Sequence, residues 1–522
     1  MNPVPARING RKNNAVKSAQ KRKSGLSTEK RILDAASKNF GYTMLRPGQG
    51  DAIAALLKRK DTLVVMPTGS GKSAIYQITG VMMPGSVLVV SPLIALQKDQ
   101  VDALNETKAK GEAVIVNSAL STSELRENFE KIAGGEGKFI FLAPEQLRKQ
   151  ETIEALERSN IKLFVVDEAH CISEWGHDFR PDYLQLGPVV DRLNHPVVLA
   201  MTATASAQVR EEIKTRLHLK NPKVLVQGFD RPNIFLRVDH FPDPQKKLEA
   251  LVHRVRWADK PGLVYVSTRR SAEDIMRMLA EEGVNALHYH GGLKASERTE
   301  YQERFMNGEA EVIVATNAFG MGVDKADIRF VYHFDIPDSL DSYYQEIGRA
   351  GRDGKRAEAC LFFREQDIGQ ASFRAGEGKL DEQQLEQLVE VIADQEGPVE
   401  PEEIAEQANL PERKLTTAIH RLEDVGAVKV LPSGEVSANE DLEVQEAAEA
   451  AAREQELRRE TRKDRLQRMR EYAETTACRR EHLLNYFGDD FKGPCNNCDN
   501  CQAAHPEMSV DPSVGTRREV VA

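Results

Sequence analysis

The sequence lacks the features of a membrane protein or a secreted protein. Its 522 residues contain no apolar run that reaches the roughly 18 residues a membrane-spanning helix needs. The first residues, M-N-P-V-P-A-R-I-N-G-R-K, lack the apolar segment of a secretory signal. We therefore expect a cytoplasmic protein that does not act in a membrane.

Cysteine is also scarce, with six in the chain. Cys171 and Cys360 lie apart, and the other four have the spacing C-x16-C-x2-C-x2-C: Cys478, Cys495, Cys498 and Cys501. This usage is typical of a metal site in a reducing compartment rather than of a disulfide framework. Four thiolates can enclose a structural Zn²⁺ ion, but the tight triplet also suits an iron–sulfur cluster. Spacing alone leaves both metals open.

The chain has no excess of positive charge. Its net charge of −10 argues by itself against non-specific binding to nucleic acid. The charge is uneven, however: residues 1–24 hold seven Lys or Arg and no acid, whereas residues 381–456 are mainly acidic. Because a basic groove can coexist with acidic appendages, the total charge excludes little.

A glycine-rich run follows the apolar stretch 62–66 and precedes an expected helix. Its backbone N–H groups and the helix N-terminus can hold phosphate oxygens. Lys72 would neutralise the outer phosphates, and the Ser73 hydroxyl would help to hold Mg²⁺. Met66 stands where the general pattern has glycine. The phosphate-binding residues of this run are Thr68, Gly69, Ser70, Gly71, Lys72 and Ser73.

A second run, V-V-D-E-A-H, ends an apolar stretch that begins at Ile161. Asp167 would emerge from a buried strand and supply the other carboxylate beside Mg²⁺, and Glu168 would orient a water molecule. The two runs together predict a protein that binds and hydrolyses a nucleoside triphosphate.

Continuous apolar strands alternate with helical stretches twice along the chain. Such strands are buried on both faces, which predicts two α/β lobes with parallel sheets covered by helices. The segments that we expect are a disordered basic tail (1–25), a first lobe that binds ATP (26–227), a second lobe (228–366), a linker (367–380), a winged-helix-like unit (381–438), charged helices with the cysteine cluster (439–502) and a flexible tail (503–522).

The winged-helix-like unit is predicted from the order helix, helix, turn, helix and hairpin between Leu380 and Ala438. The stretch from Glu440 to Thr476 then predicts a charged, solvated helix, with ion pairs such as Glu454–Arg458 and Glu456–Arg459.

Several longer motifs carry a resemblance to a known family. They include F-G-Y-T-M-L-R-P-G-Q before the glycine-rich run, D-E-A-H-C-I-S-E-W-G-H-D-F-R-P-D-Y from Asp167, and Q-E-I-G-R-A-G-R-D-G in the second lobe. From about Phe40 to Arg364, and again at the cysteine cluster, the chain strongly resembles the RecQ family of DNA helicases in superfamily 2. The resemblance implies two RecA-like lobes and an ATP- and Mg²⁺-dependent 3′–5′ helicase.

The resemblance assigns roles around the nucleotide. Tyr42 and Arg46 would sandwich adenine, and Gln49 would read its polar edge. His170 would couple the nucleotide site to DNA. In the second lobe, the nucleotide-binding and catalytic candidates are Gln345, Arg349 and Arg352.

The two arginines are spaced i, i+3, so on a helix Arg349 and Arg352 would share one face. From there they could reach the γ-phosphate when the lobes close, with Arg352 as the arginine finger.

The resemblance also indicates DNA contacts. Within the aromatic-rich loop Cys171–Tyr183, Trp175 and Phe179 would stack on bases beside Arg180, whereas Cys171 would be structural. Phosphate contacts are expected from residues at strand ends in both lobes: Ser91, Thr204, Ser267, Thr268 and Thr316.

The run A-C-R-R-E-H-L-L-N-Y-F predicts a helix that carries Cys478. This segment resembles the RecQ zinc module, which favours zinc over an iron–sulfur cluster. The chain departs from the family pattern because the 381–438 unit lies between the second lobe and this module. About twenty residues follow Cys501, too few for a winged helix there, which puts a duplex-splitting hairpin in doubt.

One hypothesis is that the inserted unit grips duplex DNA. The basic side chains that motivate it lie on its third helix: Arg413, Lys414, His420 and Arg421. The alternative is a structural or protein-docking role.

The leading function is therefore a helicase on single-stranded and forked DNA, used in repair, recombination or replication. It would be nucleoid-associated in a prokaryote and could meet single-strand-binding or repair proteins. An RNA helicase is one alternative, and comparing DNA- and RNA-stimulated ATPase rates separates the two. The other is a winged-helix regulator that senses ATP without turnover, which the intact Lys72, Glu168 and Arg352 argue against.

Overall fold

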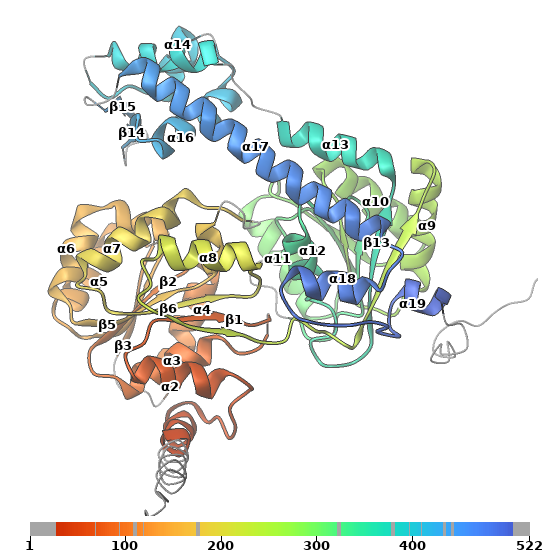
Figure 1. Cartoon of the computed structure of the whole chain (residues 1–522), viewed down its shortest axis with the longest axis horizontal. Helices are drawn as coiled ribbons and strands as arrows, with labels where there is room; N and C mark the ends of the chain where they lie inside the picture. The colour runs from red at the N-terminus through yellow and green to blue at the C-terminus, as the bar shows by residue number, and fades with distance from the viewer. Residues whose placement is uncertain are drawn as a thin grey trace, which may run out of the picture. The chain divides into compact units, whose positions relative to one another are not determined.

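The computed structural model describes residues 28–504 except 68, 93, 108–111, 118–119, 174–177, 321–324, 377–381, 396, 409, 432–434 and 440–442. These residues form two compact units (Figure 1). Unit 1 holds the described residues up to Arg231 and also Phe487–Asp489, whereas unit 2 holds the rest. The predicted terminal tails, apart from residues 503 and 504, lie outside the described residues.

Unit 1 is built on a seven-stranded parallel sheet in the order β3-β4-β2-β5-β6-β1-β7. The strands are β1 (Thr62–Val65), β2 (Ser86–Val90), β3 (Glu112–Val116), β4 (Gly137–Leu142), β5 (Ile161–Val166), β6 (Val197–Thr202) and β7 (Lys223–Val226). The strands β1, β2 and β6 are buried along their whole length, as expected for a parallel sheet covered on both faces.

Helices and short 3-10 turns connect these strands. The helices are α2 (Gln49–Leu57), α3 (Ser73–Met82), α4 (Ile94–Asn105), α5 (Thr122–Ala133), α6 (Gln150–Arg158), α7 (Leu186–Arg192) and α8 (Ala207–Arg216). The 3-10 turns are η1 (Pro144–Arg148), η2 (Ala169–Ile172) and η3 (Pro181–Gln185). Ile53, Tyr76 and Phe139 are among the buried residues of the core between helices and sheet.

Unit 2 contains a second parallel sheet, with six strands in the order β10-β11-β9-β12-β13-β8. The strands are β8 (Ile234–His240), β9 (Gly262–Tyr265), β10 (Ala286–Tyr289), β11 (Val312–Ala315), β12 (Phe330–His333) and β13 (Ala357–Phe363). The helices among them are α9 (Pro244–Trp257), α10 (Arg269–Glu281), α11 (Ala295–Met306) and α12 (Leu340–Ile347). The two parallel α/β sheets confirm the predicted fold class.

A helix–hairpin unit follows the second sheet and confirms the predicted order of elements. It consists of α14 (Glu382–Ala393), α15 (Pro401–Gln407), α16 (Glu412–Asp424) and the antiparallel strands β14 (Val428–Val430) and β15 (Val436–Ala438). Its own apolar core includes Leu388 and Leu422, and Ala447 and Ala451 of the long helix α17 (Val444–Glu474) complete it. Both predicted ion pairs on α17 are confirmed, with N–O distances of 2.7 Å for Arg458–Glu454 and 3.1 Å for Arg459–Glu456.

The expected linker 367–380 is wrong over its first ten residues, because α13 (Glu365–Gly376) occupies them. Asp367 is buried in the first turn of this helix and accepts from Lys247 Nζ at 2.5 Å and from Arg364 Nε at 2.9 Å. These contacts fix α13 against α9. The division of unit 2 into separate domains stays a prediction, because its contacts group the sheet, the helix–hairpin unit and the cysteine segment together.

The last two described helices are α18 (Arg479–Tyr486) and α19 (Asp499–Ala504). Among the described helices, none is long and apolar enough to cross a membrane.

Candidate functional site

The glycine-rich loop lies at the carboxyl end of β1. Met66 N donates to Thr202 O at 3.1 Å, which fixes the start of the loop against the end of β6. Gly69 and Gly71 both have φ of +78°, a left-handed conformation that favours glycine. A Cβ on Gly71 would lie 2.8 Å from Gln49 Nε2, so this position also lacks room for a side chain. Thr68 lies outside the described residues.

Lys72 and Ser73 join the loop to α3. Lys72 Nζ lies over the loop and donates to Met66 O at 3.1 Å and Pro67 O at 3.5 Å. Ser73 is the first residue of α3, whose positive N-terminal end faces the loop. An ammonium group and a helix N-terminus at one loop are the features that hold a polyphosphate.

The acidic pair lies at the end of β5. Asp167 N donates to Val90 O at 2.9 Å, and the Ser91 hydroxyl lies 3.5 Å from Asp167 Oδ2. Burial raises the pKa of Asp167 to about 6, and the neighbouring Glu168 carboxylate adds to this rise, whereas Lys72 opposes it. Adjacent carboxyl groups that are costly to charge favour a cation, and oxygen ligands of this kind suit Mg²⁺.

The residues expected at the adenine ring lie against the same loop. Gln49 Oε1 accepts from Arg46 N at 2.8 Å, and Gln49 Nε2 donates to Gly71 O at 2.8 Å. Arg46 Nη1 donates to Gly69 O. Tyr42 is 38% exposed, and its ring stacks on that of Phe40 at 5.9 Å between centroids. One hydrogen-bond network therefore joins Arg46 and Gln49 to the phosphate loop.

His170 links the acidic pair to the end of β6. Its Nδ1 lies 2.8 Å from Thr202 Oγ1 and 3.3 Å from Glu168 Oε2. Because the Thr202 hydroxyl donates to Thr204 O at 2.9 Å, Nδ1 is the donor to Thr202. Burial acts to lower the pKa of His170, but the neighbouring Cys171 sulfur, as a hydrogen-bond acceptor, and the Glu168 carboxylate outweigh burial and raise the pKa above its ordinary value. This chain of contacts is a physical route for the predicted coupling.

The structure describes the aromatic-rich loop in part, because Trp175 lies outside the described residues. Phe179 is half-buried. Arg180 donates to Asp178 Oδ2 from Nε at 3.2 Å and from Nη2 at 3.1 Å, and to Pro92 O at 3.4 Å. Cys171 is buried, and burial raises the pKa of its thiol, in agreement with a structural role.

The predicted helix that carries both arginines of unit 2 is wrong. α12 ends at Ile347, and Arg349 and Arg352 lie in the turns that follow. The helix is capped by Gly348. Gly351 then turns the chain with φ of +56°, and a Cβ there would lie 2.4 Å from Asn233 Nδ2. Arg349 is buried, whereas Arg352 and the earlier Gln345 are half-buried. Their approach to the nucleotide stays a prediction.

The five phosphate-contact candidates differ in exposure. Ser91, Thr204 and Thr316 are buried. Ser267 and Thr268 are exposed where β9 leads into α10, and Thr268 accepts from Ser271 N as the helix cap. The exposed pair is therefore accessible to solvent, whereas the buried three are covered, and all five stay predicted phosphate contacts.

Sequence reasoning missed Asp335, which follows β12 and accepts from both Ser267 N and Ser267 Oγ at 2.7 Å. The run F-D-I-P directly after an apolar strand was the available signal, because parallel strands place their carboxyl ends at one edge.

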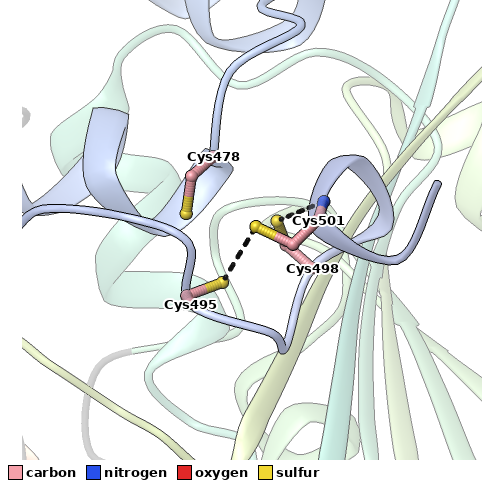
Figure 2. Close-up of side chains that lie close together, drawn as sticks. All are labelled: Cys478, Cys495, Cys498 and Cys501. Atoms are coloured by element: carbon pink, nitrogen blue, oxygen red, sulfur yellow. Dashed lines mark hydrogen bonds between the residues drawn. The ribbon is translucent and has the colours of Figure 1, made fainter. Parts of the chain in front are cut away.

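The four clustered cysteines converge in unit 2 (Figure 2). Their Sγ atoms all lie within 4.8 Å of one another, and Cys495 and Cys501 are 3.9 Å apart. Zinc–sulfur bonds of about 2.3 Å place tetrahedral ligands about 3.8 Å apart, so the four thiols fit zinc. The prediction that Cys478 lies on a helix is wrong by one residue, because α18 begins at Arg479 and Cys478 accepts from His482 N just before it.

Comparison with known proteins agrees with both sites. Three family models match: DEAD/DEAH box helicase over residues 46–213, helicase conserved C-terminal domain over 245–354 and RecQ zinc-binding over 439–502. The probable ATP-dependent DNA helicase RecS of Bacillus subtilis (strain 168) is 37% identical over 488 residues, which cover 92% of this chain and 93% of RecS. The chain belongs to the RecQ family of ATP-dependent DNA helicases. Its four cysteines form the zinc site of that family.

Two relatives named RecQ are longer than the part that aligns. RecQ of Bacillus subtilis (strain 168) is 42% identical over 67% of this chain and 59% of its own length. RecQ of Pasteurella multocida (strain Pm70) is 36% identical over 90% of this chain and 62% of its own length. By contrast, the match to RecS spans 92% of this chain and 93% of RecS.

Among solved structures, the DUF1998 helicase MrfA bound to DNA aligns with a TM-score of 0.55 at 18% identity. The match covers 80% of this chain and 63% of MrfA. At this identity the likeness concerns the fold alone.

Proposed function

We propose that this RecQ-family helicase hydrolyses ATP with Mg²⁺ held by Ser73 and Asp167, while Glu168 activates the attacking water. Arg352, assisted by Arg349, completes the site when the lobes close. Each cycle moves the protein 3′ to 5′ along single-stranded DNA and opens duplex or forked DNA.

One observation carries this proposal: the loop with Lys72, the acidic pair and the link from His170 to Thr202 form a connected cluster. The loop joins it because Met66 N donates to Thr202 O and because Lys72 acts on the charge of Asp167. Loss of the γ-phosphate would change the position or charge of Glu168, and the contact between Glu168 and His170 would pass this change on to His170. The end of β6, which His170 touches, leads into the segment with the DNA candidate Thr204. Hydrolysis and DNA contact are thereby connected within one lobe.

The family supports a role in DNA repair, recombination or replication, in the cytoplasm at the nucleoid. Single-stranded and forked DNA are the proposed substrates. Single-strand-binding and repair proteins are the partners that such substrates would bring.

The test is strand separation by the full-length protein on forked, 3′-tailed and 5′-tailed duplexes, with ATP and Mg²⁺. We expect unwinding of the forked and 3′-tailed substrates and none of the 5′-tailed one. Lys72→Ala should abolish unwinding, because it removes the charge that neutralises the phosphates. Preference for the 5′ tail would overturn the polarity, and unwinding by Lys72→Ala would overturn the site.

We hypothesise that the helix–hairpin unit grips duplex DNA through four basic side chains. One of the four is already bonded within the protein. Arg421 Nη1 donates to Gln455 Oε1 on α17, so Arg421 packs within unit 2. The side chains of Arg413 and His420 lie outside the described residues, and Lys414 is half-buried. Lys414→Glu should weaken forked-duplex unwinding under this hypothesis, and unchanged unwinding would leave the structural role.

A further inference from the structure

Three side chains outside the helicase machinery meet at one edge of the second sheet. Glu273 lies in α10, His288 lies in the edge strand β10, and His290 follows that strand directly. One ligand atom of each residue lies within 4.8 Å of the other two. Among the described residues, only the four zinc-binding cysteines form another group of this kind.

The backbone arranges the two histidines for a common partner. Side chains at i and i+2 of a strand point to the same face, so His288 and His290 point the same way. Their ring centroids are 5.2 Å apart, and the ring of Tyr301 in α11 packs edge-on against His288 at 5.6 Å. Three elements therefore hold the imidazole rings in place.

His290 and Glu273 already lie at a distance that suits two ligands of one metal ion. His290 Nε2 lies 3.2 Å from Glu273 Oε1. Bonds of about 2.0–2.1 Å place the ligands of a tetrahedral ion about 3.3 Å apart, so an ion fits between these two atoms with little movement. The other nitrogen, His290 Nδ1, is buried without a hydrogen-bond partner among the described residues. Only the Nε2 edge of the ring is therefore open to an ion.

The chemistry of the set favours a borderline transition metal. Imidazole nitrogens suit Zn²⁺, Co²⁺ and Ni²⁺, and a carboxylate completes a three-ligand set with one position left for water. Glu273 keeps 45% of its side chain exposed, whereas His290 keeps 6%, so the site has one open side. We propose that Glu273, His288 and His290 form a further divalent-metal site, distinct from the closed four-cysteine site and from the proposed Mg²⁺ site at the nucleotide.

An ion there would link α10 to β10 next to the candidate DNA contacts. Thr268 caps α10 one turn before Glu273, and Thr316 N donates to Tyr289 O at 3.1 Å between the two histidines. Occupancy would therefore fix the start of α10 and the position of Thr268. The site does not depend on the proposed polarity or catalytic roles.

The test is a Co²⁺ titration of the full-length protein with zinc already in its cysteine site. We expect one further equivalent of Co²⁺, with the absorption of a nitrogen- and oxygen-ligated ion and no thiolate charge-transfer band. His288→Ala and Glu273→Gln should each weaken this binding at least tenfold, because loss even of an outer-shell partner costs about 10–100-fold in affinity. His253→Ala, which removes an exposed histidine of α9, should bind as the parent does.

Thermal unfolding gives a second readout without activity. Zn²⁺ in slight excess should raise the midpoint of the parent and of His253→Ala but not that of His288→Ala, whose metal-free midpoint should match the parent. Absence of a second equivalent in the parent would overturn the proposal. The proposal would also be overturned if both His288→Ala and Glu273→Gln bound Co²⁺ as tightly as the parent protein does, because the ion would then lie elsewhere.

Discussion

Gln49 is a single amide that connects the adenine candidate Arg46 to the phosphate loop. It is buried, and its two polar ends bond to Arg46 N and Gly71 O. Both bonds are to backbone, so the side chain fixes the shape of the loop as well as any contact to a base. An amide can accept at one end and donate at the other, which a carboxylate or a hydroxyl of this length cannot do.

Gln49→Ala should raise the KM for ATP about tenfold or more. Removing two bonds from a buried position costs about 1–3 kcal/mol, and 1.4 kcal/mol corresponds to a factor of ten. ATPase assays over a range of ATP concentrations check this. Gln150→Ala, which removes an exposed glutamine of α6, is the matched control and should leave KM unchanged.

Glu168→Gln should lower kcat for ATP hydrolysis about 10²–10⁴-fold while ATP still binds. An amide has nearly the same shape as the carboxylate but cannot take a proton from water. Single-turnover hydrolysis and fluorescent-nucleotide binding separate the two effects. A rate within threefold of the parent would show that another group activates the water, and Glu151→Gln on α6 is the control for charge alone.

Motif residues were predictable because their chemistry restricts the residue type, but their partners were not. Lys72, Asp167 and the four cysteines came from short runs in the chain. The contact of Ser267 with Asp335 joins residues far apart in sequence, and it depends on which strands are neighbours. The burial of Ser91 and Thr204 has the same origin.

At the scale of elements, the spacing of apolar residues and the local composition predicted both sheets and the order of elements in the helix–hairpin unit. Apolar runs of β-branched residues predicted strands, because a parallel strand is buried on both faces. Three errors concern helix boundaries, and the smallest is the one-residue error at Cys478. Gly348 caps α12 before Arg352, and α13 continues through glycine-containing sequence because Asp367 is anchored from outside the helix.

The Lys247–Asp367 contact predicts an asymmetric response. Asp367→Leu should destabilise the protein by about 3–5 kcal/mol, since it leaves the buried Lys247 ammonium without its carboxylate. Lys247→Met should cost clearly less, because Arg364 still pairs with Asp367 at 2.7 Å. Denaturant unfolding followed by circular dichroism measures both. Equal costs for the two variants would contradict this account of α13.

At the scale of the whole molecule, the zinc module is fastened to the second sheet. Asp499 accepts from Val238 N at 2.9 Å, and Arg480 donates to Ile234 O at 2.6 Å, both on β8. The metal holds Cys478 beside the 495–501 loop, so it also keeps these contacts together.

Loss of the metal should therefore loosen more than its own loop. Cys495→Ala should abolish stoichiometric zinc and lower the thermal midpoint by more than about 5 °C, because apparent zinc binding is worth about 10–16 kcal/mol and 1 kcal/mol moves the midpoint by about 2–4 °C. Zinc analysis and thermal unfolding check this. Cys360→Ala removes a buried cysteine of β13 and should keep its zinc. A zinc-free Cys495→Ala protein with an unchanged midpoint would contradict a structural role.

The sequence by itself determined the chemistry of this protein: the phosphate loop, the acidic pair, the four thiolates and the order of the elements. These depend on residue type and local spacing, which the chain carries directly. Only the tertiary structure decided which side chains are exposed, where helices end and which distant residues meet, such as Glu273 with His290. Those outcomes depend on packing between segments far apart in the chain, which local sequence patterns do not specify.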